Sequence, residues 1–356
     1  MSIDQDPLIF DGHNDVVLRL SEMAEEERHI HFFDGHRDGH LDLPRMKKGG
    51  FGGGFFAIFV PSPKEDDDDS GKMLGESYDL PLPVEIPVAK ALPIVLSMVA
   101  LLSRLERESE GQIQICTSSS DVRRCFEKKK IAIIMHIEGA EAIDDDFNAL
   151  EVLYRAGLRS VGLVWSRPSR FGHGVPFRFP GSPDTGPGLT DLGKKLVQAC
   201  NQLNMVVDLA HLNEAGFWDV AKISDAPLVV SHANCHSLCL HSRNLTDKQL
   251  EAIGESGGIV GLNFATGFIR SDGQMRADTD LGDLLCHMDH LIEHVGVDGV
   301  GFGSDFDGAK IPEEIGDVAG LAYLRKAMVQ HGYDQQTMAK LCHGNWLRVL
   351  EQTLKC

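Results

Sequence analysis

The sequence predicts an α/β fold, a (β/α)8 TIM barrel with inserted loops, because apolar strand-like runs alternate with helix-like segments throughout the chain. Eight candidate strands end near His13, Val60, Glu138, Val164, Asp208, His232, Asn263 and Asp305. Polar side chains close nearly all of these runs, and barrel active sites collect groups from several strands at the C-terminal face. A doubly wound open sheet is the alternative. We expect a single (β/α)8 barrel domain over residues 1–356.

The composition suits one large soluble domain and argues against polyanionic partners. The chain has 356 residues, 42% of them hydrophobic, with 53 acidic against 34 basic side chains and a formal charge of -19. Nucleic acids and anionic membranes attract Lys and Arg, so we expect neither as a partner.

Three features indicate a cytoplasmic protein. The segment from Met1 to Asp6 lacks the basic and then apolar pattern of a signal peptide. The most apolar helix-like stretch, residues 91–102, contains Pro93 and is expected to be too short to span a bilayer. The eight cysteines show no spacing framework, and we expect reduced thiols.

The segments between the strands include amphipathic helices and a long loop. In the stretch from Asn148 to Gly157, apolar residues share one face and the glycine suits a helix C-cap. The stretch from Pro168 to Gly188 is rich in Gly and Pro and is long for a loop between strand and helix. We expect this loop to shape a substrate pocket at the barrel mouth.

The first candidate strand ends in a His-x-Asp pair, His13 and Asp15. Residues two apart on an extended chain point the same way, so both side chains can hold one cation. An isolated pair of this kind is more often a hydrogen-bonded strand end.

A second strand-like run, residues 131–138, is apolar and closes on Glu138. A carboxylate buried there must be paired, protonated or bound to a metal. His136 shares its face, and for this residue a satisfied core histidine is the favoured interpretation.

Two further runs each deliver one histidine, His211 and His232, at or just past their ends. Neutral imidazoles with carboxylates suit Zn²⁺ and similar ions. With Glu138 central among five ligands, the set suits two metals ~3.5–4 Å apart, bridged by that carboxylate and a hydroxide.

The last candidate strand leads into Gly303-Ser304-Asp305-Phe306-Asp307-Gly308. The Asp305 carboxylate could take a proton from metal-bound water and return it to a leaving amine. Asp307 precedes a glycine and is interpreted as a turn residue.

A short stretch containing His232, Cys235, His236, Cys239 and His241 offers a rival metal site, a structural zinc knuckle. It has no second Cys pair, and its first histidine has a better assignment, so this hypothesis is disfavoured.

Together the motifs resemble the membrane (renal) dipeptidase family of the amidohydrolase superfamily, over about Phe10 to Leu350. The segments that carry the likeness are Asp11-Gly12-His13-Asn14-Asp15, His40-Leu41-Asp42-Leu43-Pro44, Ile137-Glu138-Gly139, Arg243-Asn244-Leu245, the Asp305 motif and Gly344-Asn345-Trp346-Leu347-Arg348-Val349.

The resemblance implies a binuclear zinc site and assigns its residues. His13 and Asp15 would hold one Zn²⁺, His211 and His232 the other, with Glu138 bridging. Asp305 would be the general acid and base. Arg243 would bind the substrate carboxylate, which agrees with the bidentate chemistry of a guanidinium.

The sequence departs from this family around the expected pocket. Where relatives carry Leu-Thr-His, with a substrate-contacting histidine, this chain has Leu163-Val164-Trp165. We therefore take Trp165, His173 in the following loop and the strand-end residue Asn263 as candidate substrate contacts. Phe268 stands where some relatives have a pocket tyrosine.

The resemblance implies a zinc-dependent dipeptidase that accepts a D-residue at the C-terminal position of its substrate, and a possible homodimer. An amidohydrolase that deacylates N-acyl amino acids at the same metals is the alternative. A non-catalytic binding protein is disfavoured because the five ligands and Asp305 are all present.

Overall fold

Eight parallel strands close into a barrel in the computed structural model, which describes residues 6–36, 38–63 and 69–355. Its strands are β1 (Ile9–Asn14), β2 (Phe51–Phe59), β5 (Ile131–Glu138), β6 (Leu158–Gly162), β8 (Val206–Asp208), β9 (Val229–Ala233), β10 (Ile259–Leu262) and β11 (Val300–Phe302). They follow one another around the sheet in chain order, and β2 pairs with β5 to close it. The predicted (β/α)8 barrel is confirmed, and the open sheet is excluded. The N-terminal segment Met1–Gln5, used in the argument about targeting, lies outside the described residues.

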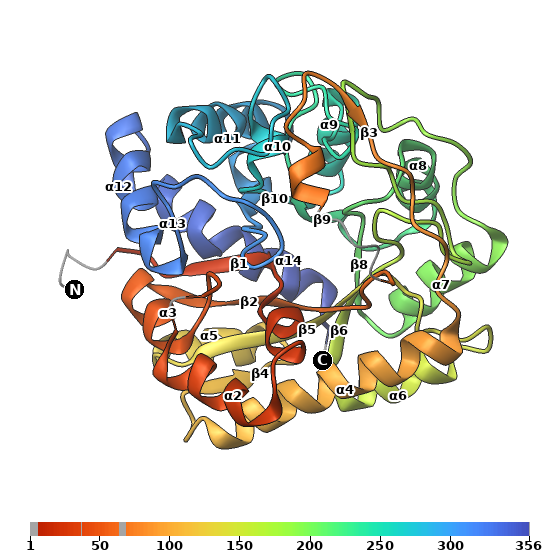
Figure 1. Cartoon of the computed structure of the whole chain (residues 1–356), viewed down its shortest axis with the longest axis horizontal. Helices are drawn as coiled ribbons and strands as arrows, with labels where there is room; N and C mark the ends of the chain where they lie inside the picture. Colours follow the sequence, from red (N-terminus) through yellow and green to blue (C-terminus); the bar gives the residue numbers. More distant parts are fainter. Residues whose placement is uncertain (1–5, 37, 64–68, 356) are drawn as a thin grey trace.

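Helices cover the outside of the barrel (Figure 1). They are α1 (Val16–Ser21), α2 (Glu25–His29), α3 (Leu43–Gly49), α4 (Val88–Glu108), α5 (Ser119–Glu127), α6 (Asn148–Ala156), α7 (Asp191–Gln202), α8 (Glu214–Ile223), α9 (Asp247–Glu255), α10 (Thr266–Ile269), α11 (Leu281–Val295), α12 (Leu321–His331), α13 (Gln335–Ala339) and α14 (Asn345–Thr353). The helix predicted from Asn148 is α6, which ends at Gly157 with φ +115°. Glycine adopts this left-handed backbone without a Cβ penalty.

Three short strands lie outside the barrel. β4 (Ile113–Ile115) extends the sheet beside the start of β5. β3 (Tyr78–Asp79) and β7 (Arg178–Phe179) form an antiparallel pair. This pair joins the loop after β2 to the loop after β6, so two long loops support each other.

The N-terminal end of the barrel is filled by one aromatic side chain, Trp346 of α14. Its ring lies 6.0 Å from that of Phe10 and 5.3 Å from that of Phe55, and its Nε1 donates to Phe302 O at 3.0 Å. A Cβ at Gly12 would lie 2.5 Å from the indole. The absence of a side chain there lets the tryptophan enter, which explains the glycine of the Asp-Gly-His motif.

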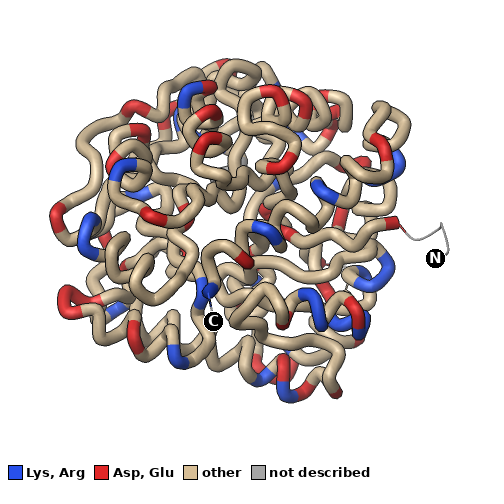
Figure 2. Tube along the Cα trace, turned by 180° about the vertical axis from the view of Figure 1, so that it is seen from behind, with Lys and Arg blue, Asp and Glu red and all other residues tan. Residues whose placement is uncertain are grey.

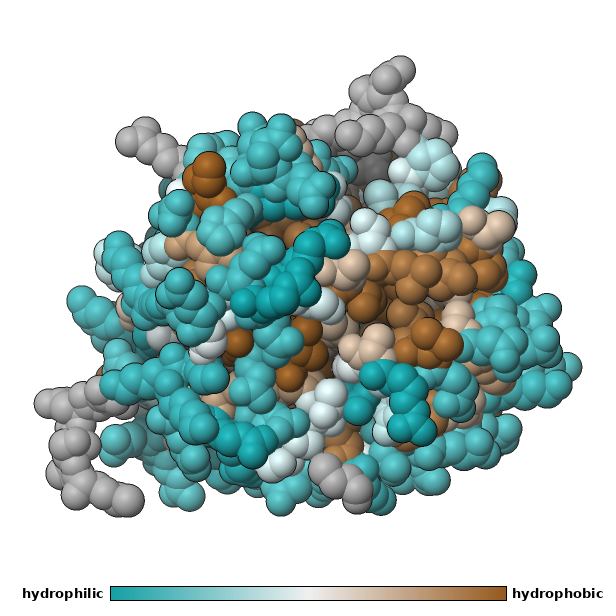
Figure 3. All heavy atoms as spheres, turned by 90° about the horizontal axis from the view of Figure 1, so that it is seen from below, coloured by the Kyte–Doolittle hydropathy of each residue, from teal (hydrophilic) through white to brown (hydrophobic). Residues whose placement is uncertain are grey.

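Helix α4 corrects one expectation from the sequence. Residues 91–102 belong to a 21-residue helix that, by length and composition alone, could cross a membrane, so they were wrongly expected to be too short. In the structure, α4 packs against α1, β2 and β4, and side chains such as Val95 and Leu102 are buried. Figure 3 shows apolar side chains gathered on the lower side, along which α4 lies in Figure 1.

Charges and thiols are dispersed. Figure 2 shows the positions of basic residues scattered along the chain among those of acidic residues. The seven cysteines within the described ranges are all free, as expected, although the Sγ atoms of Cys116 and Cys125 are only 3.6 Å apart.

Candidate metal centre and active site

The predicted metal ligands meet at the C-terminal end of the barrel. His13 belongs to β1, Asp15 follows it, Glu138 ends β5, His211 follows β8 and His232 belongs to β9. All five side chains are buried. Parallel strands present their carboxyl ends at one face, which brings residues far apart in sequence together.

Glu138 is at the centre of this group. Its Oε1 lies 3.0 Å from His211 Nε2, 3.6 Å from His232 Nε2 and 3.7 Å from His13 Nε2. His13 Nε2 is also 3.1 Å from Asp15 Oδ2, and the Nε2 atoms of His211 and His232 are 3.1 Å apart. One carboxylate oxygen thus faces three imidazoles.

Hydrogen bonds on the far side of the histidine rings leave the Nε2 atoms free to bind a cation. Ser231 Oγ donates to Asp208 Oδ2 at 2.5 Å, so it accepts from His232 Nδ1 at 2.8 Å. The proton of a neutral His232 is therefore on Nδ1, and Nε2 carries a lone pair. Ser166 Oγ lies 2.8 Å from His211 Nδ1 and can act similarly. Such outer partners orient metal-binding histidines.

Burial and mutual charge set the protonation of the group. Burial, with the nearby charges of His13 and Arg243, lowers the pKa of His211 and His232 well below its usual range. Burial raises the pKa of Glu138 to about 8. Burial disfavours the charged form of His13, but the carboxylates of Glu138 and Asp15 outweigh it and raise its pKa to about 10.

These observations fit a cation between the ligands. Neutral His211 and His232 point acceptor nitrogens at each other across 3.1 Å, and two acceptors so placed repel. A divalent ion turns these contacts into favourable ones. Imidazole with carboxylate is a zinc-type donor set.

Two residues of the site have strained backbones. His211 has φ +65° and Asp305 has φ +60°. Such angles are uncommon outside glycine, and residues held in them cluster at active sites. Their side chains are aimed into the site by the turn that follows each strand.

Asp305 lies beside the first ligand pair. It forms a potential metal-binding group with His13 and Asp15, and its Oδ2 accepts from Asn263 Nδ2 at 3.0 Å. Burial raises its pKa. Asn263 therefore contacts this carboxylate, and its expected contact with substrate stays a prediction.

Arg243 is buried behind the histidines. Its guanidinium donates to His232 O at 3.2 Å, and its Nε has no hydrogen-bond partner among the described residues. Burial lowers the pKa of Arg243 to about 10, against the attraction of Asp305 and Glu138. A buried cation with an unused donor suits an anionic substrate group.

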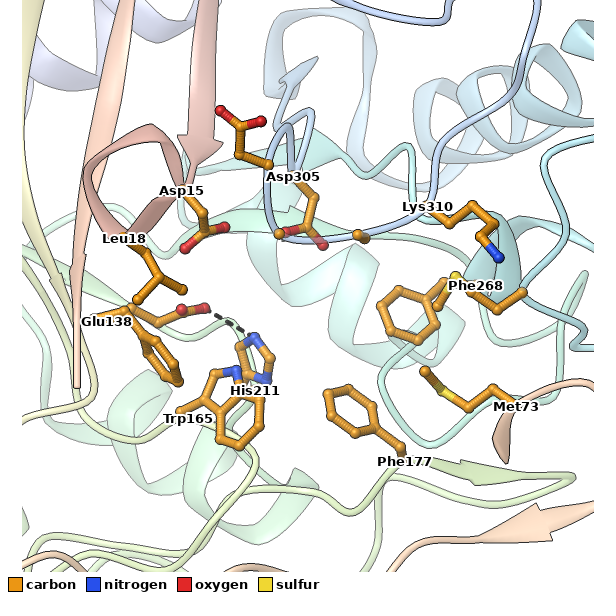
Figure 4. Close-up of a pocket in the computed structure, with 15 residues that line it drawn as sticks. Asp15, Leu18, Met73, Glu138, Trp165, Phe177, His211, Phe268, Asp305 and Lys310 are labelled. Atoms are coloured by element: carbon orange, nitrogen blue, oxygen red, sulfur yellow. Dashed lines mark ion pairs between the residues drawn. The ribbon is translucent and has the colours of Figure 1, made fainter. Parts of the chain in front are cut away.

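A cavity of about 260 Å³ opens onto the metal ligands. Figure 4 shows the carboxylates and His211 on one side and an apolar wall opposite. The apolar side chains that line it are those of Leu18, Phe59, Met73, Trp165, Phe177, Phe268, Met275 and Ala309. Phe177 and Phe268 stack 6.1 Å apart, and Trp165 packs 5.6 Å from Phe177. The predicted loop from Pro168 to Gly188 therefore does shape the pocket, through Phe177.

Comparison with known proteins identifies the chain. The model of the membrane dipeptidase family (peptidase family M19) matches residues 2–356. The chain belongs to this family. This membership, together with metallo-dipeptidase relatives more than 50% identical to it, makes the protein a hydrolase of the metallo-dipeptidase type.

Three relatives illustrate the match. A metallo peptidase from Rhodobacter sphaeroides, crystallised with a phosphinate mimic of L-Ala-D-Ala, is 52% identical with TM-score 0.96, over 98% of this chain and 100% of that one. The dipeptidase AC, a metallo peptidase of family M19, is 51% identical with TM-score 0.96, over 99% and 100%. An uncharacterized protein in the pqqA 5'region of Klebsiella pneumoniae is 47% identical over 260 residues, 73% of this chain and 96% of that protein.

Some candidates lie outside this membrane dipeptidase site. His173 is not among the residues that line the cavity, and its backbone carbonyl accepts from Asn213 N at 3.1 Å. His136 is a core histidine beneath His13, 2.9 Å from Ser160 Oγ, and burial lowers its pKa to about 4. The knuckle residues are dispersed: Cys235 Sγ contacts His287 O, and Cys239 Sγ contacts Gly267 O.

Sequence reasoning missed the serines that orient the histidines and most of the apolar wall. Ser231 directly precedes His232, and Asp208 closes a strand, so their polar character inside apolar runs was an available signal. No signal in the sequence pointed to Met73, Met275 or Lys310 as cavity residues. Each comes from a loop, and the local sequence does not specify the path of that loop.

Proposed function

We propose that this chain is a zinc-dependent dipeptidase with two metal ions, acting on dipeptides that include L-Xaa-D-Xaa and have apolar side chains. The observation that supports it most is Glu138, whose Oε1 faces three imidazole nitrogens within 3.7 Å at the rim of an apolar cavity. The relative from Rhodobacter sphaeroides binds a mimic of L-Ala-D-Ala.

His13 and Asp15 would hold one ion, His211 and His232 the other, and Glu138 would bridge them. The ions would polarise the scissile carbonyl and lower the pKa of a water toward ~7, which makes a nucleophile available at neutral pH. Ser231, Asp208 and Ser166 keep the imidazole lone pairs directed at the ions.

Arg243 would bind the C-terminal carboxylate of the dipeptide. Its unused Nε and its buried position favour a charged hydrogen bond over a contact with neutral groups. This contact would fix the distance from the substrate's end to the scissile bond, and so select dipeptides over longer chains.

Asp305 would carry the proton. It would accept one from the attacking water and donate it to the leaving nitrogen, which must be protonated before the C–N bond breaks. Asn263 donates to Oδ2 and so keeps the other carboxylate oxygen available for this transfer.

The wall formed by Trp165, Phe177 and Phe268 would contact the side chains of the substrate. Its aromatic rings offer apolar area and few hydrogen bonds, so apolar side chains gain most from burial there. The same wall supports the second candidate, deacylation of N-acyl amino acids, because an acyl chain could occupy it.

A substrate panel tests the proposal. Zinc-loaded enzyme would be given L-Xaa-D-Xaa and L-Xaa-L-Xaa dipeptides beside their N-acetylated counterparts, and amino-acid release measured. Turnover of the free dipeptides, including those with a C-terminal D-residue, is the expected result. Reaction of only the acetylated compounds would move the substrate class to N-acyl amino acids.

We further propose that the enzyme acts in the cytoplasm. The free state of its seven described cysteines supports a reducing compartment. Fractionation of the source cells, with activity in the soluble fraction, is the expected result.

A further inference from the structure

A second group of metal-type side chains lies in the outer helical layer. Asp247 of α9 and His290 and His294 of α11 offer ligand atoms within 4.8 Å of one another. All three residues are half-buried, and none lines the catalytic cavity. This group, which we call the α9–α11 cluster, also includes Glu251 at its edge.

The cluster follows from helical periodicity. His290 and His294 are one turn apart on α11, and Asp247 and Glu251 are one turn apart on α9. Residues four apart share a helix face, so each helix presents two potential ligands to its neighbour. The histidine rings are 4.4 Å apart between centroids.

Contacts between the two helices hold these faces together. His290 Nε2 lies 2.8 Å from Asp247 Oδ1, and His294 Nδ1 lies 3.6 Å from Glu251 Oε1. Further along, α9 approaches α11 so closely that a Cβ at Gly254 would lie 2.6 Å from Val295 O. The glycine permits this approach, so the ligand geometry is set by helix packing before any ion binds.

The donor set selects the class of ion. Two imidazoles with a carboxylate suit Zn²⁺ and related transition metals, whereas Ca²⁺ and Mg²⁺ prefer oxygen ligands alone. We propose that the α9–α11 cluster binds one zinc-type ion through His290, His294 and Asp247, separately from the catalytic metals.

A simple hydrogen-bonded cluster is the competing interpretation. It accounts for His290, which contacts Asp247 and Ser237 Oγ at 2.9 Å. It does not account for His294, because the 3.6 Å separation from Glu251 exceeds hydrogen-bond distance. The rings of His290 and His294 are adjacent but share no hydrogen bond, and a cation bound by both would give them a favourable interaction.

The position of the ion gives it a structural role. Ser237 and Asp247 lie near the two ends of the segment between β9 and α9, and that segment contains Arg243. An ion held by Asp247 and the α11 histidines would fasten this segment to the helical layer. We expect thermal stabilisation by bound metal, without a direct part in the reaction.

The test counts ions on the whole enzyme. Wild-type protein and the His290→Gln/His294→Gln variant would be dialysed against the same buffered free zinc and their zinc content measured. Wild type is expected to hold one ion more per chain. The single variant His294→Gln should weaken binding at this site by about 10-fold or more, since even indirect ligand partners contribute that much. Equal zinc content in both proteins would overturn the proposal, whatever the number of catalytic ions.

Two controls test whether the extra zinc depends on these two histidines in particular and whether it stabilises the fold. His331→Gln alters another surface histidine, one that contacts Asp289, and should leave zinc content unchanged. Added zinc should raise the melting temperature of wild type more than that of the double variant, each measured against its own melting temperature in zinc-free buffer. Loss of the extra zinc in the His331 variant as well would also overturn the assignment.

Discussion

The Asn263 amide donates to Asp305 Oδ2 at 3.0 Å, and Asn263 Oδ1 in turn accepts from Ala265 N at 2.6 Å. The second contact fixes the orientation of the amide, so the first defines which carboxylate oxygen of Asp305 is engaged. Ligand atoms of Asp305, His13 and Asp15 lie within 4.8 Å of one another, so Asp305 is also close to the first pair of proposed metal ligands. A proton carrier in this position has one constrained oxygen and one free for transfer.

Replacing Asp305 by Asn should remove most turnover while metal stays bound. The amide has nearly the shape of the carboxylate but cannot carry the proton, and such a role contributes about 10²–10⁴-fold. Steady-state kcat and zinc content are the measurements. Asp298→Asn, on the surface, is the matched control. Unchanged kcat in the Asp305 variant would remove its assigned role.

Replacing Arg243 by Lys should lower kcat/KM for free dipeptides by about 10- to 100-fold, because a hydrogen bond to a charged group contributes about 1.5–3 kcal/mol. Dipeptide amides, which lack the carboxylate, should lose much less. The exposed Arg276→Lys is the control. An equal loss for free dipeptides and amides would mean that Arg243 supports the fold rather than the substrate.

Replacing Trp165 by Ala should lower kcat/KM for dipeptides with large apolar side chains by about 10- to 100-fold, the equivalent of burying one large apolar side chain. Dipeptides of alanine and glycine should be affected less, because they reach the wall less. Trp218→Ala, on the outside of α8, gives the same chemical change away from the cavity. A uniform effect on all substrates would argue against contact with their side chains.

Zinc binding to metal-free enzyme should release protons at about pH 7, because metal displaces protons from its ligands. His13 and Glu138, with pKa values of about 10 and about 8, hold protons there in the metal-free chain. Both protons compete with the metal, so affinity should rise as pH rises toward 8.

Calorimetry in buffers of different ionisation enthalpy measures the protons released. The His290→Gln/His294→Gln background restricts the signal to the catalytic ligands. The Glu138→Gln variant has no carboxyl proton to lose at this position, so it should release fewer protons on binding zinc than the protein with Glu138. If the heat of zinc binding were the same in every buffer, no protons would be released, and the prediction that His13 and Glu138 are protonated would be wrong.

Replacing Trp346 by Ala should destabilise the fold by about 3–5 kcal/mol, since it empties the end of the barrel between Phe10 and Phe55. Urea unfolding measures the change. Tyr323→Ala, at an exposed position of α12, should alter stability by under about 0.5 kcal/mol. A small effect at Trp346 would mean that the neighbouring rings collapse into the space.

The residues proposed as metal ligands could be singled out from sequence because they lie at or just past the ends of apolar strands, where the local pattern specifies both the strand and the polar residue that closes it. His13, Glu138 and Asp305 are of this kind. Parallel strands then deliver these ends to one face whatever the details of packing. The eight strands and the metal-type chemistry were therefore determined by sequence alone.

The tertiary structure decided what surrounds those ligands. Met73, Phe177 and Met275 reach the cavity from three loops, and the proposed contact by His173 failed to find support because loop paths depend on distant partners such as the β3–β7 pair. Residues 43 apart, Asp247 and His290, meet only because two helices pack closely. Local sequence determines which side chains a strand or helix presents, whereas packing between elements determines which of them meet.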